Sequence, residues 1–296
     1  MPKYVIYFAG GTMRGVFGAG VAMAFERSNF YQKVSAVYGA SAGAMTGAYF
    51  LARQTELGAS IYWENLNNKF ISYKGFFIGV WQRFQNRFIK SIPRKDFRDA
   101  LNIGYLMQVV KNEKHLDVGK IISQNIPLNV KLFNLDSHQI EYIDVRRPDI
   151  LEILETAVSA FPYVHEVSII DGKKYIDAAV IDIIGIDFLR KKHPNEKIIV
   201  IMNGQIDRKL RYWVKNVIEG KFMQWMFDDA GFFGLHASAE AKLAKDLEII
   251  KSDPQFFLIT PDKDVSVRSR TTNANSLLQM YNLGIEAGQR AMQNMI

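Results

Sequence analysis

The hydrophobic positions of the chain follow two different periods. Residues 3–9, KYVIYFA, form a continuous β-branched and aromatic run that ends in glycines, which is typical of a buried strand. Residues 14–27 instead place apolar side chains at helical spacing. Residues 34–39 return to the strand pattern and lead into a small-residue helix at 41–53. Because strand, glycine turn and helix occur twice in succession, the pattern predicts a parallel sheet with helices on both faces.

The later segments continue this α/β pattern. Further strands are expected at 127–135, 139–145, 197–203 and 255–261, and further helices at 150–161, 183–192 and 274–292. A hairpin is expected at Asp171-Gly172, between the strand-like residues 166–170 and 173–178.

Domain organisation follows from these elements and from the absence of any internal repeat or linker. We expect one α/β domain over residues 1–296, with three α/β/α layers and a mainly parallel central sheet. A helical insertion near 60–120 and a helical extension near 207–251 interrupt the alternation. A hydrophobic content of 48% is ample for a core of this size.

Charge and cysteine content narrow the classes of function. A net charge of +7 favours an anionic partner, which means nucleic acid, a membrane surface or an anionic substrate. The chain has no cysteine, which excludes disulfides, thiol nucleophiles and thiolate metal sites. The N-terminal apolar run is interpreted as a strand rather than a signal peptide, and no apolar run approaches the ~20 residues of a membrane helix. We therefore expect a cytoplasmic protein, either free or peripheral on a membrane.

Ser41 is the first candidate for chemistry. It lies between Gly39 and Gly43 in VYGASAGAMTG, directly after one expected strand and before a helix. In a nucleophile elbow, a serine occupies a strained turn of this kind, and its neighbours must be small. The alternative is a tight turn in which Ser41 caps the following helix.

The glycine-rich loop AGGTMRG, residues 9–15, follows the first expected strand. Adjacent glycines let backbone N–H groups point together at an anion, such as the oxyanion of an acyl-transfer reaction. A nucleotide loop is the alternative, but no Lys-Ser/Thr pair follows, and Thr12 takes the place of the second glycine of a dinucleotide fingerprint.

A serine nucleophile needs a group that accepts its proton. None of the five histidines, His115, His138, His165, His193 and His236, has a local context that marks it as a base, although His165 and His236 remain possible. Three aspartates lie close together, namely Asp171, Asp177 and Asp182. Asp171 suits the hairpin turn, whereas Asp177 ends a strand and precedes two alanines. A carboxylate is ionised at neutral pH and is able to accept a proton when it is held close to the serine.

These motifs resemble those of the patatin-like phospholipase family, acyl hydrolases with a Ser–Asp dyad, and especially its bacterial stand-alone members. The family motif G-G-G-x-[RK]-G matches residues 10–15 except at Thr12, and G-x-S-x-G matches residues 39–43 in full. The third motif, D-G-[GA], matches residues 177–179 with alanine in place of the glycine. The block before Asp177 and the closing LLQMYNLGIEAG also resemble the family, so the resemblance runs from about residue 3 to 292.

The resemblance implies a role for each matching residue. Ser41 would be the nucleophile and Asp177 the base, and the backbone amides of Gly10, Gly11, Thr12 and Met13 would form the oxyanion hole. The remaining motif positions are Arg14, Gly15, Gly39, Gly43, Ala178 and Ala179.

The expected activity is metal-independent hydrolysis of fatty-acyl esters of phospholipids and other lipids through an acyl-enzyme, with no cofactor. Because Thr12 and Ala178 depart from the motifs, a weak or inactive family member that binds lipid or a protein partner is the alternative.

Residues 69–95 form a basic and aromatic segment. A helix at 76–91 would place four aromatic side chains on one face, Phe77, Trp81, Phe84 and Phe88, with basic residues on the other. This pattern is typical of a helix that rests on anionic lipid, and the alternative is a helix packed on the core. We expect a lipid substrate at an anionic membrane surface and no nucleic acid, because no aromatic-interleaved base-reading motif is present.

Overall fold

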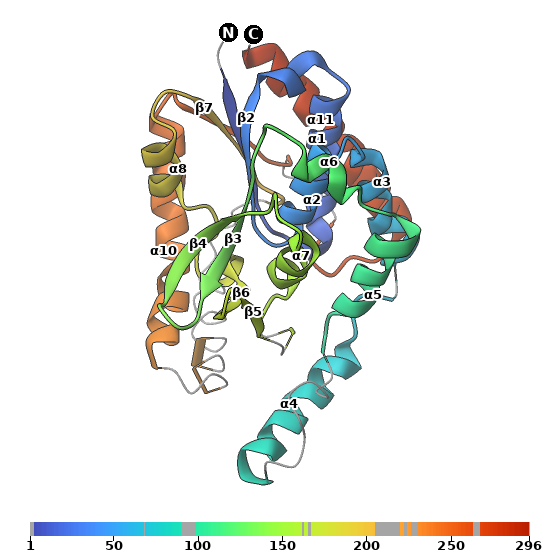
Figure 1. Ribbon diagram of the computed structural model, residues 1–296, viewed down its shortest axis with the longest axis vertical. Helices are drawn as coiled ribbons and strands as arrows, with labels where there is room; N and C mark the ends of the chain where they lie inside the picture. The colour runs from blue at the N-terminus through green and yellow to red at the C-terminus, as the bar shows by residue number, and fades with distance from the viewer. Residues whose placement is uncertain are drawn as a thin grey trace.

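The computed structural model describes residues 3–67, 69–89, 99–161, 163–164, 167–204, 220–221, 224–225, 230–262 and 267–295. Within these residues, an eight-stranded sheet separates two layers of helices (Figure 1). Helices α8 (Ile186–Lys192) and α10 (Ala230–Ser252) lie on the left in that view. Helices α1 (Val16–Glu26), α2 (Ala42–Leu51) and α11 (Ala274–Met295) lie on the right. The predicted α/β class with a mostly parallel central sheet is confirmed.

Every strand that the sequence predicts is present. The strands are β1 Tyr4–Phe8, β2 Val34–Gly39, β3 Leu128–Asn134, β4 Gln139–Asp144, β5 Ser168–Ile170, β6 Lys173–Asp177, β7 Lys197–Ile201 and β8 Phe256–Ile259. Asp171 and Gly172 both have positive φ, of 51° and 77°, as a two-residue hairpin turn between β5 and β6 requires.

The predicted helices are present, with shifts that have local causes. The helix expected at 183–192 begins only at Ile186, because Gly185 adopts a left-handed conformation (φ 83°) immediately before it. The helix expected at 14–27 opens with a 3-10 turn, η1 (Thr12–Gly15), before α1. The helix expected at 150–161 ends at Val158. This last helix is α7 (Ile150–Val158). The other helical elements are η2 Asn29–Lys33, α3 Thr55–Ser60, η3 Ile61–Asn65, α5 Ile103–Gln108, η5 Val109–Glu113, α6 Val118–Ile122 and η6 Ala178–Val180.

The strand order places the motif-bearing strands side by side. The order is β5-β6-β3-β2-β1-β7-β8, with β4 paired to β3 as well. β1 is parallel to both β2 and β7, and β2 is parallel to β3. β6 and β4 are antiparallel to β3. The carboxyl ends of β2, β1 and β7 therefore meet at one edge of the sheet, where α/β proteins bind their ligands.

The central strand β1 is buried on both faces. Along β1, Tyr4, Ile6 and Phe8 belong to the core shared with α1, α2 and α11. Val5 and Tyr7 belong to the opposite core, shared with α8 and α10. This two-sided burial explains why β1 is a continuous apolar run rather than an alternating one.

The amphipathic helix expected at 76–91 is present as α4 (Tyr73–Ile89), which projects away from the sheet (Figure 1). Phe77, Trp81 and Phe84 are 71%, 59% and 49% exposed, so their side chains do not pack into the core. The side chain of Phe88 lies outside the described side chains. Across the described part of the chain, no helix combines the length and apolar character that crossing a bilayer requires.

Candidate active site

The sheet topology brings Ser41 and Asp177 together. Strand β2 pairs with β3 up to Gly39, which lies opposite Val130. Strand β6 approaches along β3 from the other direction and ends with Asp177 opposite Leu132. The carboxyl ends of β2 and β6 therefore meet head-on beside β3, with Ser41 just beyond one and Asp177 at the tip of the other.

Ser41 lies in the strained turn that a nucleophile elbow requires. Its φ of 54° and ψ of −132° are rare for a residue with a side chain. A Cβ on Gly39 would lie 2.7 Å from the backbone of Ala44, and one on Gly43 would lie 2.1 Å from the Phe8 carbonyl oxygen. Both positions therefore need glycine. Ser41 is the N-cap residue of α2, but its side chain makes no capping hydrogen bond, so helix capping does not explain it.

Asp177 is a buried carboxylate, and one of its two oxygens accepts a hydrogen bond from the backbone. The residue is 1% exposed, and its Oδ1 accepts a hydrogen bond of 2.8 Å from the backbone N–H of Ala179, which caps η6. Its Oδ2 is also buried and accepts no hydrogen bond from the described residues. The Ser41 hydroxyl is close enough to lower the pKa of Asp177, and catalytic hydrogen bonds are often loose before substrate binds.

Burial dominates the acidity of Asp177. Loss of solvation raises the pKa of its carboxyl to about 6, although the Ala179 amide, Ser41 and Lys131 each lower it. A carboxyl with a pKa near the working pH is well suited to general-base catalysis. Lys131 lies on β3 between the residues that pair with Gly39 and Asp177, and it is fully buried. Its Nζ lies 3.0 Å from a carboxylate oxygen of Asp182, and burial lowers the pKa of Lys131 to about 8.

The glycine loop lies beside Ser41. A Cβ on Gly10 would lie 2.9 Å from the Cβ of Ser41 and 3.4 Å from that of Ala179, so glycine lets the loop approach both. No described residue accepts a hydrogen bond from the amides of Gly11 and Thr12. The Met13 amide donates to the Ser269 carbonyl at 3.4 Å, so it is partly engaged.

Two loop positions that the sequence singled out are structurally distinctive. Thr12 has a φ of 51°, a left-handed conformation that is unusual for a β-branched residue. This conformation accounts for the glycine that the family motif has at this position. The guanidinium of Arg14 lies against Gly204, where a Cβ would meet its Nη1 at 2.4 Å.

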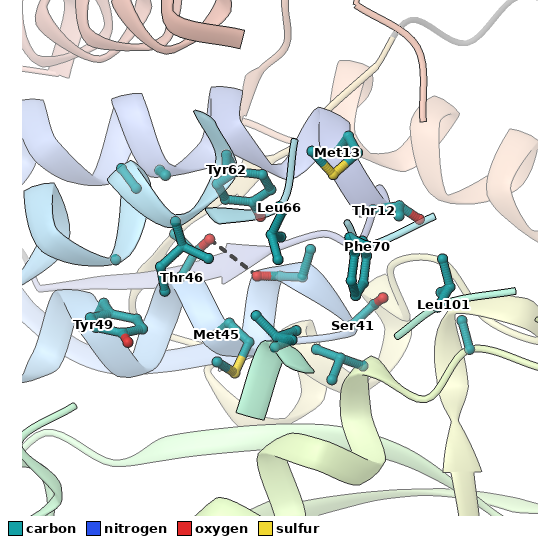
Figure 2. A pocket seen from close by; sticks show the side chains of 18 of the residues that line it. Thr12, Met13, Ser41, Met45, Thr46, Tyr49, Tyr62, Leu66, Phe70 and Leu101 are labelled. Carbon is teal, nitrogen blue, oxygen red and sulfur yellow. Dashed lines mark hydrogen bonds between the residues drawn. The ribbon is translucent and has the colours of Figure 1, made fainter. Parts of the chain in front are cut away.

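An apolar cavity opens beside Ser41 (Figure 2). Figure 2 shows Ser41, Thr12 and Phe70 toward one end and Tyr49 toward the other. The cavity volume is about 60 Å³. Since one water needs roughly 10–15 Å³ on this measure, the cavity has room for roughly four to six water-sized groups. Apart from Ser41 and a few hydroxyl-bearing residues, its lining is apolar.

The described histidines contact groups other than Ser41. His236 is buried, and its Nδ1–H donates to the Val180 carbonyl at 2.7 Å. His193 contacts the hydroxyl of Tyr38 at 2.9 Å. His115 contacts the Lys111 carbonyl, and His138 stacks on Phe133. His165 lies outside the described residues.

Sequence reasoning missed three contributors to this site. The Ala42 amide follows Ser41 at the start of α2, the position that supplies an oxyanion donor in nucleophile elbows. Lys131 interrupts the apolar run NVKLF, and a lone charge in a predicted buried strand was a signal for it. Asn203 follows β7 and binds the glycine loop, and it matches no motif that the sequence analysis recognised.

The fold and the site define a class of protein. The chain is an α/β protein with a nucleophile-elbow serine, a buried carboxylate and an adjoining apolar cavity. More specifically, the chain belongs to the patatin-like phospholipase family, whose model matches residues 6–190. This match confirms the resemblance seen in the sequence, and it supports lipid hydrolysis as the activity and lipids as the substrate class.

The remaining comparisons are with curated proteins and with solved structures. No curated protein matches the chain. Among solved structures, VipD from Legionella pneumophila is similar over 99% of this chain and 67% of its own, with 13% identity and a TM-score of 0.47. The type III effector protein ExoU is similar over 99% of this chain, which spans 53% of its length, with 10% identity and a TM-score of 0.40.

Proposed function

We propose that this protein hydrolyses fatty-acyl esters of lipids, with Ser41 as nucleophile and Asp177 as general base. The observation that carries the proposal is the head-on meeting of β2 and β6, which brings a buried carboxylate to an elbow serine that lines an apolar cavity. Family membership supports the class of substrate.

The acylation step uses groups of this chain alone. Asp177 Oδ2 accepts the Ser41 proton as Oγ attacks the ester carbonyl carbon. The amides of Gly11, Thr12 and Ala42 stabilise the resulting oxyanion, since such preorganised donors act where charge develops. Collapse of the tetrahedral intermediate breaks the ester C–O bond, and Asp177 returns the proton to the departing alcohol. The product is an acyl-Ser41 ester.

Deacylation repeats this sequence with water. Asp177 accepts a proton from water as the water oxygen attacks the acyl carbonyl, and Ser41 Oγ leaves with that proton. The fatty acid is released and the resting dyad is restored. In both steps the first carbons of the acyl chain lie in the apolar cavity, which removes them from water.

Two substitutions and a matched control test the dyad. Ser41→Ala and Asp177→Asn are expected to reduce p-nitrophenyl ester and phospholipid hydrolysis to background, because nucleophile and base act as one unit. Ser60→Ala is the control, since Ser60 is also 7% exposed but does not line the cavity. A fluorophosphonate probe is expected to label the wild type and not Ser41→Ala. A wild type that neither hydrolyses esters nor takes the label would favour the alternative of a lipid- or protein-binding family member.

We also propose that α4 docks the protein on an anionic phospholipid bilayer. Phe77, Trp81 and Phe84 are exposed on α4, and Lys69 and Lys74 are exposed at its base. The net charge of +7 complements an anionic surface. Residues near the base of α4, including Phe70 and Leu101, line the cavity beside Ser41, so a docked α4 would bring lipid close to that cavity.

Vesicle sedimentation tests this docking. The wild type is expected to bind phosphatidylcholine vesicles that contain phosphatidylglycerol more tightly than vesicles of phosphatidylcholine alone. The double variant Phe77→Ser/Trp81→Ser is expected to lose at least about tenfold in affinity, because two aromatic side chains no longer enter the interface. Leu278→Ser on α11 is the control, since Leu278 is also apolar and 41% exposed. Equal vesicle binding by the double variant and the wild type would contradict a role for α4.

A further inference from the structure

We infer that Asn203 is a positioning residue that turns the amides of the glycine loop toward Ser41. The inference rests on the proposed function, because it concerns the Gly11 amide, one of the donors that stabilise the oxyanion. Asn203 lies just beyond β7 and is 3% exposed. The family match ends at residue 190, so it does not include this residue.

Three hydrogen bonds hold the Asn203 side chain. Its Nδ2 donates to the carbonyl oxygens of Ala9, at 2.6 Å, and Gly10, at 3.3 Å. Its Oδ1 accepts from the Gly18 amide at 2.8 Å, which satisfies an N–H in the first turn of α1. One side chain thus ties the end of β7 to the glycine loop and to the helix that follows it.

These contacts also fix the direction in which the loop N–H groups point, because of the geometry of the peptide bond. In a planar trans peptide, the C=O and the N–H point in opposite directions. When Asn203 binds the Ala9 and Gly10 carbonyls, the N–H groups of Gly10 and Gly11 must therefore point away from Asn203.

The loop lies between Asn203 and Ser41. A Cβ on Gly10 would lie 2.9 Å from the Cβ of Ser41, whereas one on Gly11 would lie 3.0 Å from the Cβ of Asn203. Pointing away from Asn203 thus means pointing toward the Ser41 side. Asn203 presets the donors before substrate arrives, which is the condition for effective oxyanion stabilisation.

Two glycines are fitted to Asn203. A Cβ on Gly18 would lie 2.8 Å from Oδ1 of Asn203, and a Cβ on Gly11 would press on its Cβ. Both spaces are filled by the side chain of Asn203. Gly11 and Gly18 of GGTMRGVFG therefore make room for Asn203.

The test is Asn203→Asp, which keeps an acceptor for Gly18 and removes the donor to the loop carbonyls. We expect kcat for a p-nitrophenyl ester to fall about 10²-fold, the loss typical of one oxyanion donor, with KM changed less than about threefold. Inhibition by an alkyl boronic acid, whose tetrahedral Ser41 adduct carries a negative oxygen, is expected to weaken in parallel. Asn134→Asp is the control, because Asn134 is 2% exposed and also holds a turn through its side chain.

Gly18→Ala is a second variant in case Asn203→Asp does not fold. Its added methyl displaces the Asn203 amide while the residues of the loop stay the same, and we expect a smaller loss of kcat than for Asn203→Asp. A purely structural role would lower the melting temperature of Asn203→Asp and Asn134→Asp alike and leave kcat and boronic acid inhibition of the folded protein unchanged. That result in an active wild type would overturn this inference alone. A wild type without activity or fluorophosphonate labelling would overturn the proposed function, and this inference with it.

Discussion

Asp177→Asn is expected to make the protein more stable while it abolishes activity. Burial moves the pKa of this carboxyl from an ordinary value of 3.8 to about 6. At about 1.36 kcal/mol per pKa unit, keeping the buried group ionised costs about 3 kcal/mol of unfolding free energy. Asparagine has nearly the same shape, carries no charge, and keeps an oxygen for the Ala179 amide.

The pH dependence of this gain follows from the two pKa values. Above pH 6 the folded wild type carries the ionised group and the full cost, so the gain of the variant is about 3 kcal/mol. At pH 5 the gain falls to about half, and below the unfolded pKa it disappears, because both states of the wild type are then protonated.

Urea titrations of Asp177→Asn and the wild type at pH 8 and pH 5 measure this difference. Asp182→Asn is the control, for which the opposite change in unfolding free energy is expected. Burial opposes ionisation of Asp182, but Lys131 and Lys242 outweigh it and lower its pKa, so removing this charge is expected to destabilise the protein. If Asp177→Asn unfolds at no higher urea concentration than the wild type at pH 8, ionised Asp177 is not a cost to the fold and the reasoning fails.

Three further changes test individual parts of the site. Ser41→Gly is expected to raise the unfolding free energy by about 1 kcal/mol relative to Ser41→Ala, since the positive φ is strained for any residue with a Cβ; equal urea midpoints would contradict this. Thr12→Gly is expected to raise the free energy of unfolding by up to about 1 kcal/mol, because glycine adopts positive φ without strain, and to keep the rate of ester hydrolysis within about threefold. A rate loss above about tenfold would mean that the Thr12 side chain contacts substrate. In the wild type, the pKa of Asp177 places the acid limb of the kcat/KM profile near pH 6. Lys131→Met is expected to move this limb to higher pH, because removing a cation raises the pKa of a nearby carboxyl. An unmoved limb would show that Lys131 does not act on Asp177.

Local sequence patterns predicted most elements of the fold, since continuous apolar strands and small-residue turns carry their signal within a few residues. Strand β2 has the predicted bounds, and Asp171-Gly172 forms the expected turn. The errors lie at the ends of elements. Strands β7 and β8 both end two residues earlier than expected, and at α8 one residue, Gly185, decides the boundary through its φ. The patterns did not give the order of strands, because pairing between β7 and β1 joins segments nearly two hundred positions apart.

The same distinction explains which site residues the sequence revealed. Ser41 belongs to a motif whose spacing encodes its own turn, so it was visible from a few residues. Asn203 acts on Ala9 and Gly10 only because β7 lies beside β1, so no local pattern could reveal it. Asp177 was identified with the help of the family resemblance, and its pairing with Ser41 depends on β6 running antiparallel to β3.

The candidate site concentrates strain that its surroundings must hold in place. Ser41 and Thr12 have positive φ, and Asp177 is a buried carboxyl. Such features persist only when neighbouring structure over-determines them. Ser41 is fixed between β2 and α2, and Asp177 by the first turn of η6. Thr12 has no regular strand to hold it, so its conformation depends on the loop being anchored on its β7 side, where Asn203 binds the carbonyls of Ala9 and Gly10. Loosening that anchor should let Thr12 relax toward negative φ and rotate its amide away from Ser41, which is why the effect of Asn203 should appear in kcat rather than in KM.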